Sequence, residues 1–319
     1  MEESLIVSIG PHIRSKESTR KIMWSVVAAL IPAGLAGVFI FGLRALSVIV
    51  VSVAAAVLTE YIICAMRKRE VSIVDGSAFM TGLLLAYNVH PGVPLWMPVA
   101  GSVFAVAVGK QFFGGLGQNI FNPALVGRAF LMLSWPVWMT TWQNPRWQTD
   151  AVTTATPLAI FKEGAELGLS KLPSHLDLFI GNRGGCIGEV CIVALLLGAA
   201  YLLLRGYISW HIPVSYIAAV ALMSWAFNGK QGLFTGDSLF FVLSGGLILG
   251  AFFMATDYVT SPLTSWGKLI FGAGCGLLTF AIRRFAGYPE GVSYAILIMN
   301  AFTPLIDRYA YPKWFGWKK

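Results

Sequence analysis

Long apolar runs separated by short polar stretches dominate the chain. Ten of these runs are 14 to 24 residues long, and several reach the roughly 20 residues that a helix needs to cross the hydrocarbon core of a bilayer. They cover residues 21–42, 43–66, 73–89, 95–109, 118–135, 187–204, 210–227, 239–256, 269–282 and 292–305. The pattern predicts an all-α polytopic membrane protein of about ten transmembrane helices.

The longest polar segment divides the apolar runs into two sets of five. We therefore expect an N-terminal five-helix repeat over 1–135, an external loop segment over 136–186 and a C-terminal five-helix repeat over 187–319. Because five is an odd number, two homologous halves would be inverted relative to each other in the membrane.

Faint internal similarity supports such a repeat. Asp75-Gly-Ser and Asp237-Ser open the third run of each half, and Asn122-Pro and Asn300 with Pro304 lie in the fifth runs. Paired interrupted spans of this kind indicate a central binding site. Chance similarity among Gly-rich apolar helices is the alternative.

Basic residues predict how the chain is oriented, because cytoplasmic loops carry an excess of Lys and Arg. The rule places both termini in the cytoplasm and residues 136–186 outside. The basic residues that favour this orientation are Arg14, Lys16, Arg20, Lys21, Arg67, Lys68, Arg69, Lys110, Arg205, Lys268 and those of the C-terminal tail. Arg283 and Arg284 disagree with it.

Composition agrees with a membrane protein and limits the chemistry. Hydrophobic residues make up 56% of the chain and charged residues 12%, with a net charge of +8. The basic residues flank apolar runs, so we expect a lipid bilayer and no nucleic acid as partner. The sequence contains no CxxC, HExxH or Rossmann glycine motif, so we expect no metal, Fe–S or NAD site in this chain.

The most informative motif lies in the central polar segment. It runs from Asp150 through Thr153, Thr154 and Ala155 to Thr156, which Pro157 follows. On its own, Thr156 is a good helix N-cap and Pro157 a favoured first helical residue.

This motif resembles the signal Asp-x-x-(Ser/Thr)-Gly-Ala-Thr, at which a flavin transferase attaches FMN to the last Thr. Thr154 stands where the signal usually has Gly. Stretches 11–19, 117–124, 179–189 and 254–257 also resemble the family of Rnf complex D subunits and Nqr complex B subunits, with Tyr258 at a frequent Pro position. The start of the chain resembles Rnf D subunits more closely.

The resemblance implies a membrane flavoprotein subunit of an ion-translocating ferredoxin:NAD oxidoreductase. FMN would be joined to Thr156 by a phosphoester, with Asp150, Thr153, Thr154 and Ala155 as recognition positions. Its partners would be other membrane subunits, an external flavoprotein subunit, and cytoplasmic NAD-binding and Fe–S subunits. The fold would be urea-transporter-like, in the inner membrane.

A second flavin, riboflavin, would be held non-covalently by Asn119, Asn122 and Asp257. The two asparagines are three residues apart, so we expect them on one helix face, with Asp257 at the end of the eighth run. Hydrogen bonding between helices and capping by Asp257 is the alternative.

Four acidic residues in or beside apolar runs are candidates for an Na⁺ or H⁺ path: Glu60, Asp75, Asp237 and Glu189. Ionisable groups at membrane depth are usually functional. Asp75 and Asp237 fit helix N-caps equally well. Two other functions stay open: the B subunit of an Na⁺-translocating NADH:quinone reductase, and a channel or solute transporter without flavin.

Overall fold

The computed structural model describes residues 17–68, 72–147, 155–163, 172–229, 232–287 and 290–310. Within these ranges every regular element is a helix. The elements of the first half are α1 (Thr19–Phe41), α2 (Leu43–Met66), the 3₁₀-helix η1 (Ser72–Asp75), α3 (Ser77–Tyr87), α4 (Trp96–Val106), the π-helix η2 (Ala107–Gln111) and α5 (Pro123–Ser134). The prediction of an all-helical polytopic protein is confirmed.

Three short helices connect the halves: α6 (Pro136–Thr140), α7 (Pro157–Glu163) and α8 (His175–Ile180). Ser174 and Asp177 cap α8 reciprocally, and the hydrogen bond from the Ser174 hydroxyl lowers the pKa of Asp177. The second half consists of α9 (Ile192–Leu204), α10 (His211–Phe227), α11 (Ser238–Leu243), α12 (Leu247–Leu249), the π-helix η3 (Gly250–Met254), α13 (Ser265–Phe285) and α14 (Val292–Tyr309).

Each of the ten predicted runs contains helix, but many of the helices are short. In the described ranges α1, α2 and α13 are long and apolar enough to cross a membrane alone. The 11 residues of α3 rise only about 16 Å, roughly half a bilayer core. Two predicted spans start too early, because α5 begins at Pro123 and α9 at Ile192.

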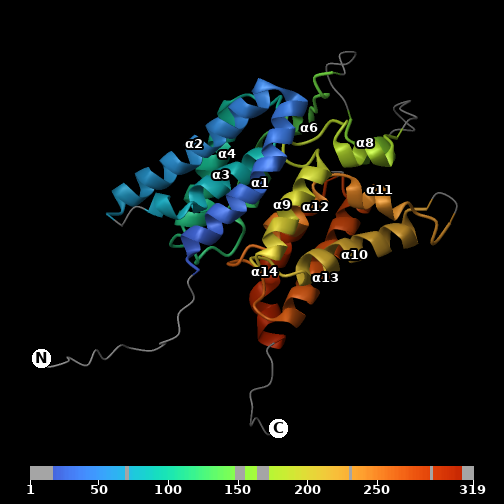
Figure 1. Cartoon of the computed structure of the whole chain (residues 1–319). Helices are drawn as coiled ribbons and strands as arrows, with labels where there is room; N and C mark the ends of the chain where they lie inside the picture. Colours follow the sequence, from blue (N-terminus) through green and yellow to red (C-terminus); the bar gives the residue numbers. More distant parts are fainter. Residues whose placement is uncertain are drawn as a thin grey trace, which may run out of the picture.

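The two halves pack their helices in the same order. In the first, α2 contacts α3 and α4, and α4 contacts α5; in the second, α10 contacts α11 and α13, and α13 contacts α14. The halves meet where α1 contacts α9 and where α5 contacts α14. Figure 1 shows the first turn of α1 and the last of α14 at one end of the bundle, with α6 and α8 at the opposite end.

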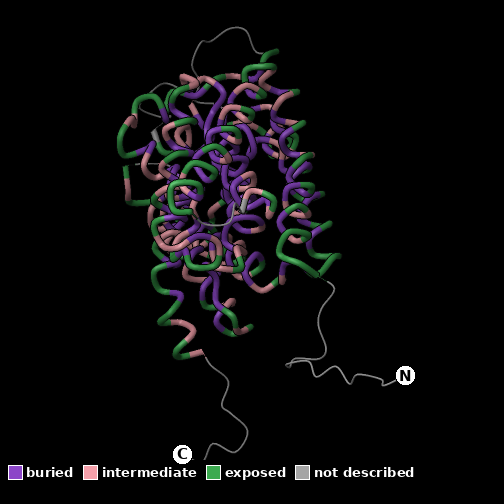
Figure 2. Tube along the Cα trace, turned by 90° about the vertical axis from the view of Figure 1, so that its left-hand side faces the viewer, coloured by how far each residue is buried: buried purple, intermediate pink, exposed green. Residues whose placement is uncertain are grey.

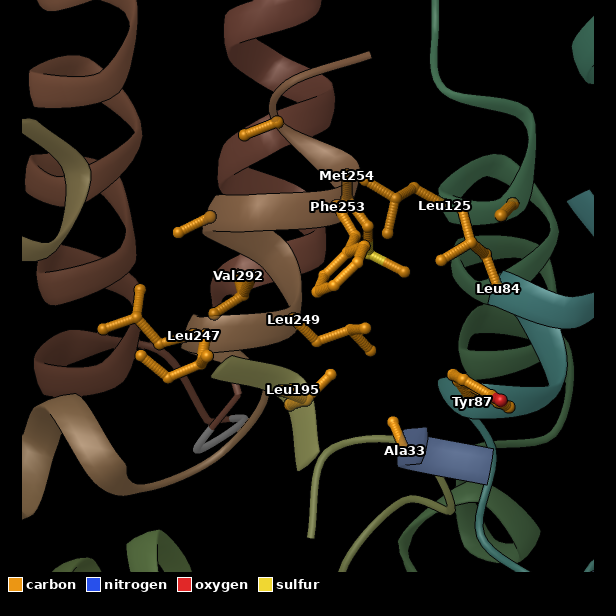
Figure 3. Close-up of a cluster of buried hydrophobic side chains, with 14 of the residues drawn as sticks. Ala33, Leu84, Tyr87, Leu125, Leu195, Leu247, Leu249, Phe253, Met254 and Val292 are labelled. Carbon is orange, nitrogen blue, oxygen red and sulfur yellow. The ribbon is translucent and has the colours of Figure 1, made fainter. Parts of the chain in front are cut away.

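The core lies between the halves. Figure 3 shows Ala33, Tyr87 and Leu125 of the first half facing Leu195 and Leu249 of the second. Close approach requires glycine here, since a Cβ on Gly198 of α9 would stand 2.0 Å from the Ala29 carbonyl oxygen of α1. Buried residues fill the centre of the bundle and exposed ones its outside (Figure 2).

Candidate functional sites

Thr156 stands at the start of α7, in the segment between the halves. Its Oγ accepts a hydrogen bond from the Ala159 N–H at 3.3 Å, so it caps the first turn. The side chain is buried, with 3% exposure, and Ala155 before it is partly buried. The other predicted signal residues, Asp150, Thr153 and Thr154, lie outside the described residues.

A cationic cavity of about 100 Å³ adjoins α7. Its lining residues are Leu158, Phe161, Lys162, Asn228, Phe241, Arg283 and Arg284. Among the described residues, this lining brings three basic side chains and no carboxylate to one place. The α7 helix is held here by Phe161, whose ring centroid lies 4.9 Å from that of Phe241 in α11.

Arg283 of α13 links this cavity to the break between α11 and α12. Its guanidinium donates to the carbonyls of Phe241 at 2.7 Å and Ser244 at 3.0 Å. Its Nε has no hydrogen-bond partner in the described part of the chain. Arg283 is buried, so it is not one of the exposed loop residues to which the orientation rule applies.

The structure brings Asn122 and Asp257 to the same cavity, at the end of the bundle where α1 begins. Asn122 caps α5 by accepting from Ala124 N at 3.1 Å, and its Nδ2 donates to the Met254 carbonyl at 3.2 Å. Asp257 accepts from the Thr260 hydroxyl at 3.2 Å. Apolar side chains of α1, including Met23, complete the wall.

Asn119 does not join this cavity. It lies in a turn before α5, where its Nδ2 donates to the Phe121 carbonyl at 3.1 Å. The prediction that Asn119 and Asn122 share a helix face is therefore wrong. The helix starts only at Pro123, whose missing N–H and fixed φ favour the first helical position.

The cavity at Asn122 and Asp257 has the chemistry of a flavin site but not the space. Its volume is about 30 Å³. Ligand pockets usually hold roughly 300 Å³ or more. The polar groups and apolar walls fit a flavin ring, whereas the cavity would have to widen before it could hold one.

Glu60 is fully buried in α2 and forms an ion pair with Lys110 of η2. Lys110 Nζ donates to both Glu60 carboxylate oxygens at 2.8 Å and to the Ser77 hydroxyl at 2.6 Å. Gln111 Nε2 adds a bond to Glu60 at 3.3 Å. Lys110 was predicted as a loop charge that sets orientation, and that prediction is wrong.

Asp75 and Asp237 both serve the starts of helices. Asp75 accepts from Ser77 N at 2.8 Å and from Ser77 Oγ at 2.5 Å. Asp237 accepts from Phe240 N at 3.0 Å and contacts His175 Nε2 at 2.8 Å, with its side chain 52% exposed. This geometry matches the capping alternative at both positions.

Glu189 lies in a buried polar cluster between the halves, which we call the junction cluster. Its members are Asn88, Arg128, Arg183, Cys186, Glu189, Ser244, Arg283 and Glu290. Arg128 donates to Glu290 and, at 2.6 Å, to Asn88 Oδ1. Glu189 Oε1 accepts from Cys186 N at 3.1 Å, and Arg183 donates to the Glu189 carbonyl at 3.2 Å.

The sequence did not identify Glu290 and Arg183 as members of a buried site. Lys110 and Arg283 were interpreted as loop residues that set orientation, although both are buried. A usable signal existed: each lies in or beside an apolar run or a glycine-rich stretch, where a charge needs a partner.

These features define an all-helical membrane protein whose two similarly packed halves enclose buried ion pairs. The chain belongs to the NQR2, RnfD, RnfE family, whose model matches residues 6–316. It is 51% identical to the D subunit of the proton-translocating ferredoxin:NAD(+) oxidoreductase complex of Clostridium ljungdahlii, over 98% of this chain and 96% of that protein.

Two further relatives are similar over most of their length. The D subunit of the Na(+)-translocating ferredoxin:NAD(+) oxidoreductase complex of Acetobacterium woodii is 49% identical, over 99% of this chain and 96% of that protein. The D subunit of the ion-translocating oxidoreductase complex of Stutzerimonas stutzeri is 38% identical, over 94% and 93%. Chains of this kind are subunits of ion-translocating oxidoreductase complexes.

Proposed function

We propose that this chain is the membrane flavoprotein subunit of an Rnf-type ferredoxin:NAD oxidoreductase and carries electrons through FMN joined to Thr156 by a phosphoester. One observation carries the proposal: Thr156 opens α7, and α7 borders the cavity of Lys162, Arg283 and Arg284. A phosphodiester bears a negative charge, which these three side chains would balance.

The residues around Thr156 have distinct roles in this proposal. Thr156 is an anchor that keeps the flavin at a fixed place, and the flavin supplies the redox chemistry when bound. Lys162, Arg283 and Arg284, which line the cavity beside α7, would donate to the phosphate. Because the Thr156 side chain is only 3% exposed, the first turn of α7 must open for a flavin transferase to reach it.

The proposal includes an orientation. The start of α1 and the end of α14 lie at the end of the bundle opposite α6 and α8 (Figure 1). With both termini in the cytoplasm, residues 136–186 and the FMN face the external side. Relatives at 51% and 49% identity are named for H⁺ and for Na⁺, so overall similarity does not select the ion.

A second, non-covalent flavin at Asn122 and Asp257, for which riboflavin is the candidate, is a further part of the proposal. We expect Asp257→Ala to lose a flavin that denaturation releases from the wild-type complex. Asn119→Ala should keep it, because Asn119 lies outside the cavity. Wild-type complex that releases no flavin on denaturation would end this part of the proposal.

Two other functions make different predictions. A quinone-reducing B subunit would carry the same covalent flavin but act with quinone, so the electron acceptor of the purified complex separates the two. A passive channel would have no use for a covalent flavin. The buried pairs Glu60–Lys110 and Arg128–Glu290 also place fixed charges inside the bundle.

The test uses three matched threonine variants in the whole complex. After denaturing electrophoresis, this subunit should fluoresce as a flavoprotein in wild type, Thr153→Ser and Thr154→Gly, because these two changes keep the recognition signal. Thr156→Ala should lose the fluorescence while the subunit remains in the complex. Fluorescence that persists in Thr156→Ala would refute attachment at this residue.

A further inference from the structure

A series of hydrogen bonds and close approaches joins the cavity at Asn122 to the break beside α7. Asn122 donates to the Met254 carbonyl at 3.2 Å, and Asn88 Nδ2 contacts Met254 Sδ at 3.6 Å. Asn88 accepts from Arg128 at 2.6 Å, and Arg128 donates to Glu290.

The series continues on the other side of Arg128. Its Nη2 lies 3.9 Å from Cys186 Sγ, and the Cys186 N–H donates to Glu189 at 3.1 Å. Glu189 Oε2 then lies against Gly246, 2.6 Å from where a Cβ would stand. A Cβ built on the neighbouring Gly245 would stand 3.1 Å from Arg283 Nη2 and 3.1 Å from Leu158 Cδ1. The junction cluster thus lies between the two proposed flavin sites.

Two carboxylate oxygens in the junction cluster lack partners. Among the described residues, Glu189 Oε2 and Glu290 Oε1 receive no hydrogen bond, although the residues are only 3% and 7% exposed. An oxygen of Glu189, an oxygen of Glu290 and Cys186 Sγ all lie within 4.8 Å of one another. A buried acceptor without a donor is costly, so this arrangement is suited to bind something positive.

A metal ion is a poor candidate for that role. The Arg128 guanidinium already donates to Glu290 and approaches Cys186, so a metal between them would face a fixed positive charge. A proton needs no coordination shell, and by forming an O–H bond on one orphan oxygen it neutralises one of the two neighbouring carboxylates.

We propose that Glu189 and Glu290 form a proton-binding site that takes up one proton when negative charge is added to a flanking flavin site. The proton comes from solvent water and forms an O–H bond on Glu290 Oε1 or Glu189 Oε2. The flanking charge rests on the proposed function, whereas the carboxyl pair is present without it.

The charged groups around the pair explain the coupling. Arg128 of α5, Arg183 of the loop before α9 and Arg283 of α13 face the two carboxylates, so the ionised cluster carries one more positive than negative charge. Cys186 and Tyr216 of α10 are the other titratable groups nearby. A negative charge added to a neighbouring cavity is little screened in this buried region, and a proton on the pair restores the balance.

The test is an infrared difference spectrum of the whole complex, reduced by dithionite minus oxidised, with flavin content measured in the same sample. We expect a protonated-carboxyl C=O band that grows on reduction and shifts in D₂O. Glu290→Gln and Glu189→Gln should each abolish it, whereas Glu17→Gln, a change at an exposed residue, should leave it.

Normal flavin content with a band that neither variant changes would overturn the inference and leave the proposed function standing. A band that added Na⁺ abolishes at constant ionic strength would also overturn it, in favour of a cation site. If the complex contains no flavin, the proposed function fails instead. The pair is then tested by pH-difference spectra, in which the absence of a band sensitive to Glu290→Gln contradicts the inference.

Discussion

Lys110 donates to both carboxylate oxygens of Glu60, at 2.8 Å each, inside the first half of the bundle. The side chains are 2% and 0% exposed, so solvent does not screen the attraction between the two charges. The π-helix η2 places Lys110 here, at the end of α4. The Glu60–Lys110 pair, whose carboxylate is a candidate for an ion path, therefore also joins α2 to η2. We call this ion pair the lock.

Removing one partner of this lock should destabilise the protein strongly. We expect Lys110→Met to cost about 3–5 kcal/mol, because it removes the ammonium group that bonds both oxygens of the buried Glu60 carboxylate. The double variant with Glu60→Gln should recover much of the loss. Unfolding of the purified complex measures both, with Lys21→Met at the exposed Glu17 pair as a control that should change nothing. Equal stability of the single and double variants would contradict the lock.

The contact between α1 and α9 should be sensitive to a single methyl group. Gly198→Ala places a Cβ 2.0 Å from the Ala29 carbonyl oxygen, so the helices must separate. We expect a loss of roughly 1–3 kcal/mol, as for other overpacked positions. Gly287→Ala, where no atom of the described residues lies within 4 Å of the new Cβ, is the matched control. If both variants unfold like wild type, the helices are not this close.

Asp237 offers a way to separate a helix cap from an ion ligand. Its Oδ1 accepts from Phe240 N, so Asp237→Ala should lose about 1 kcal/mol of stability. Asp237→Ser keeps a capping oxygen without the charge and should restore stability. Transport per folded complex should be unchanged in both variants. Loss of transport in Asp237→Ser would show that the carboxylate has a role besides capping.

The cationic cavity should affect flavin attachment in a graded way. We expect Lys162→Met and Arg284→Met each to lower the FMN content of the subunit several-fold, because both remove a positive charge that would face the phosphate of the proposed FMN. Asn228→Ala, which changes the same lining without changing charge, should have little effect. Flavin content per subunit, read from absorbance, gives the result. An FMN content equal to that of wild type in all three variants would exclude the cavity as the phosphate site.

Much of the fold could be predicted because apolar run length and helical period are local properties of the sequence. The same information predicted that α5 starts too early. The apolar run begins at residue 118, whereas the helix begins at Pro123. It also could not show that α3 is only 11 residues long. Such short helices are stable in membranes only where the neighbouring loops are buried in protein.

The sites were predicted unevenly for a related reason. Asn122 and Asp257 were brought together as expected, while Asn119 was excluded by a turn that depends on the backbone rather than on spacing. The partner of Arg128 was missed altogether. Glu290 is more than 150 residues away in sequence, and only the packing of α5 against α14 brings the two together.

The most direct test of the central claim is tandem mass spectrometry of this subunit from the purified complex. The account predicts one FMN moiety on the peptide that contains residues 150–158, with fragment ions that place the added mass on Thr156. Unmodified Thr156 in flavin-containing complex, or FMN placed on another residue, would contradict the account.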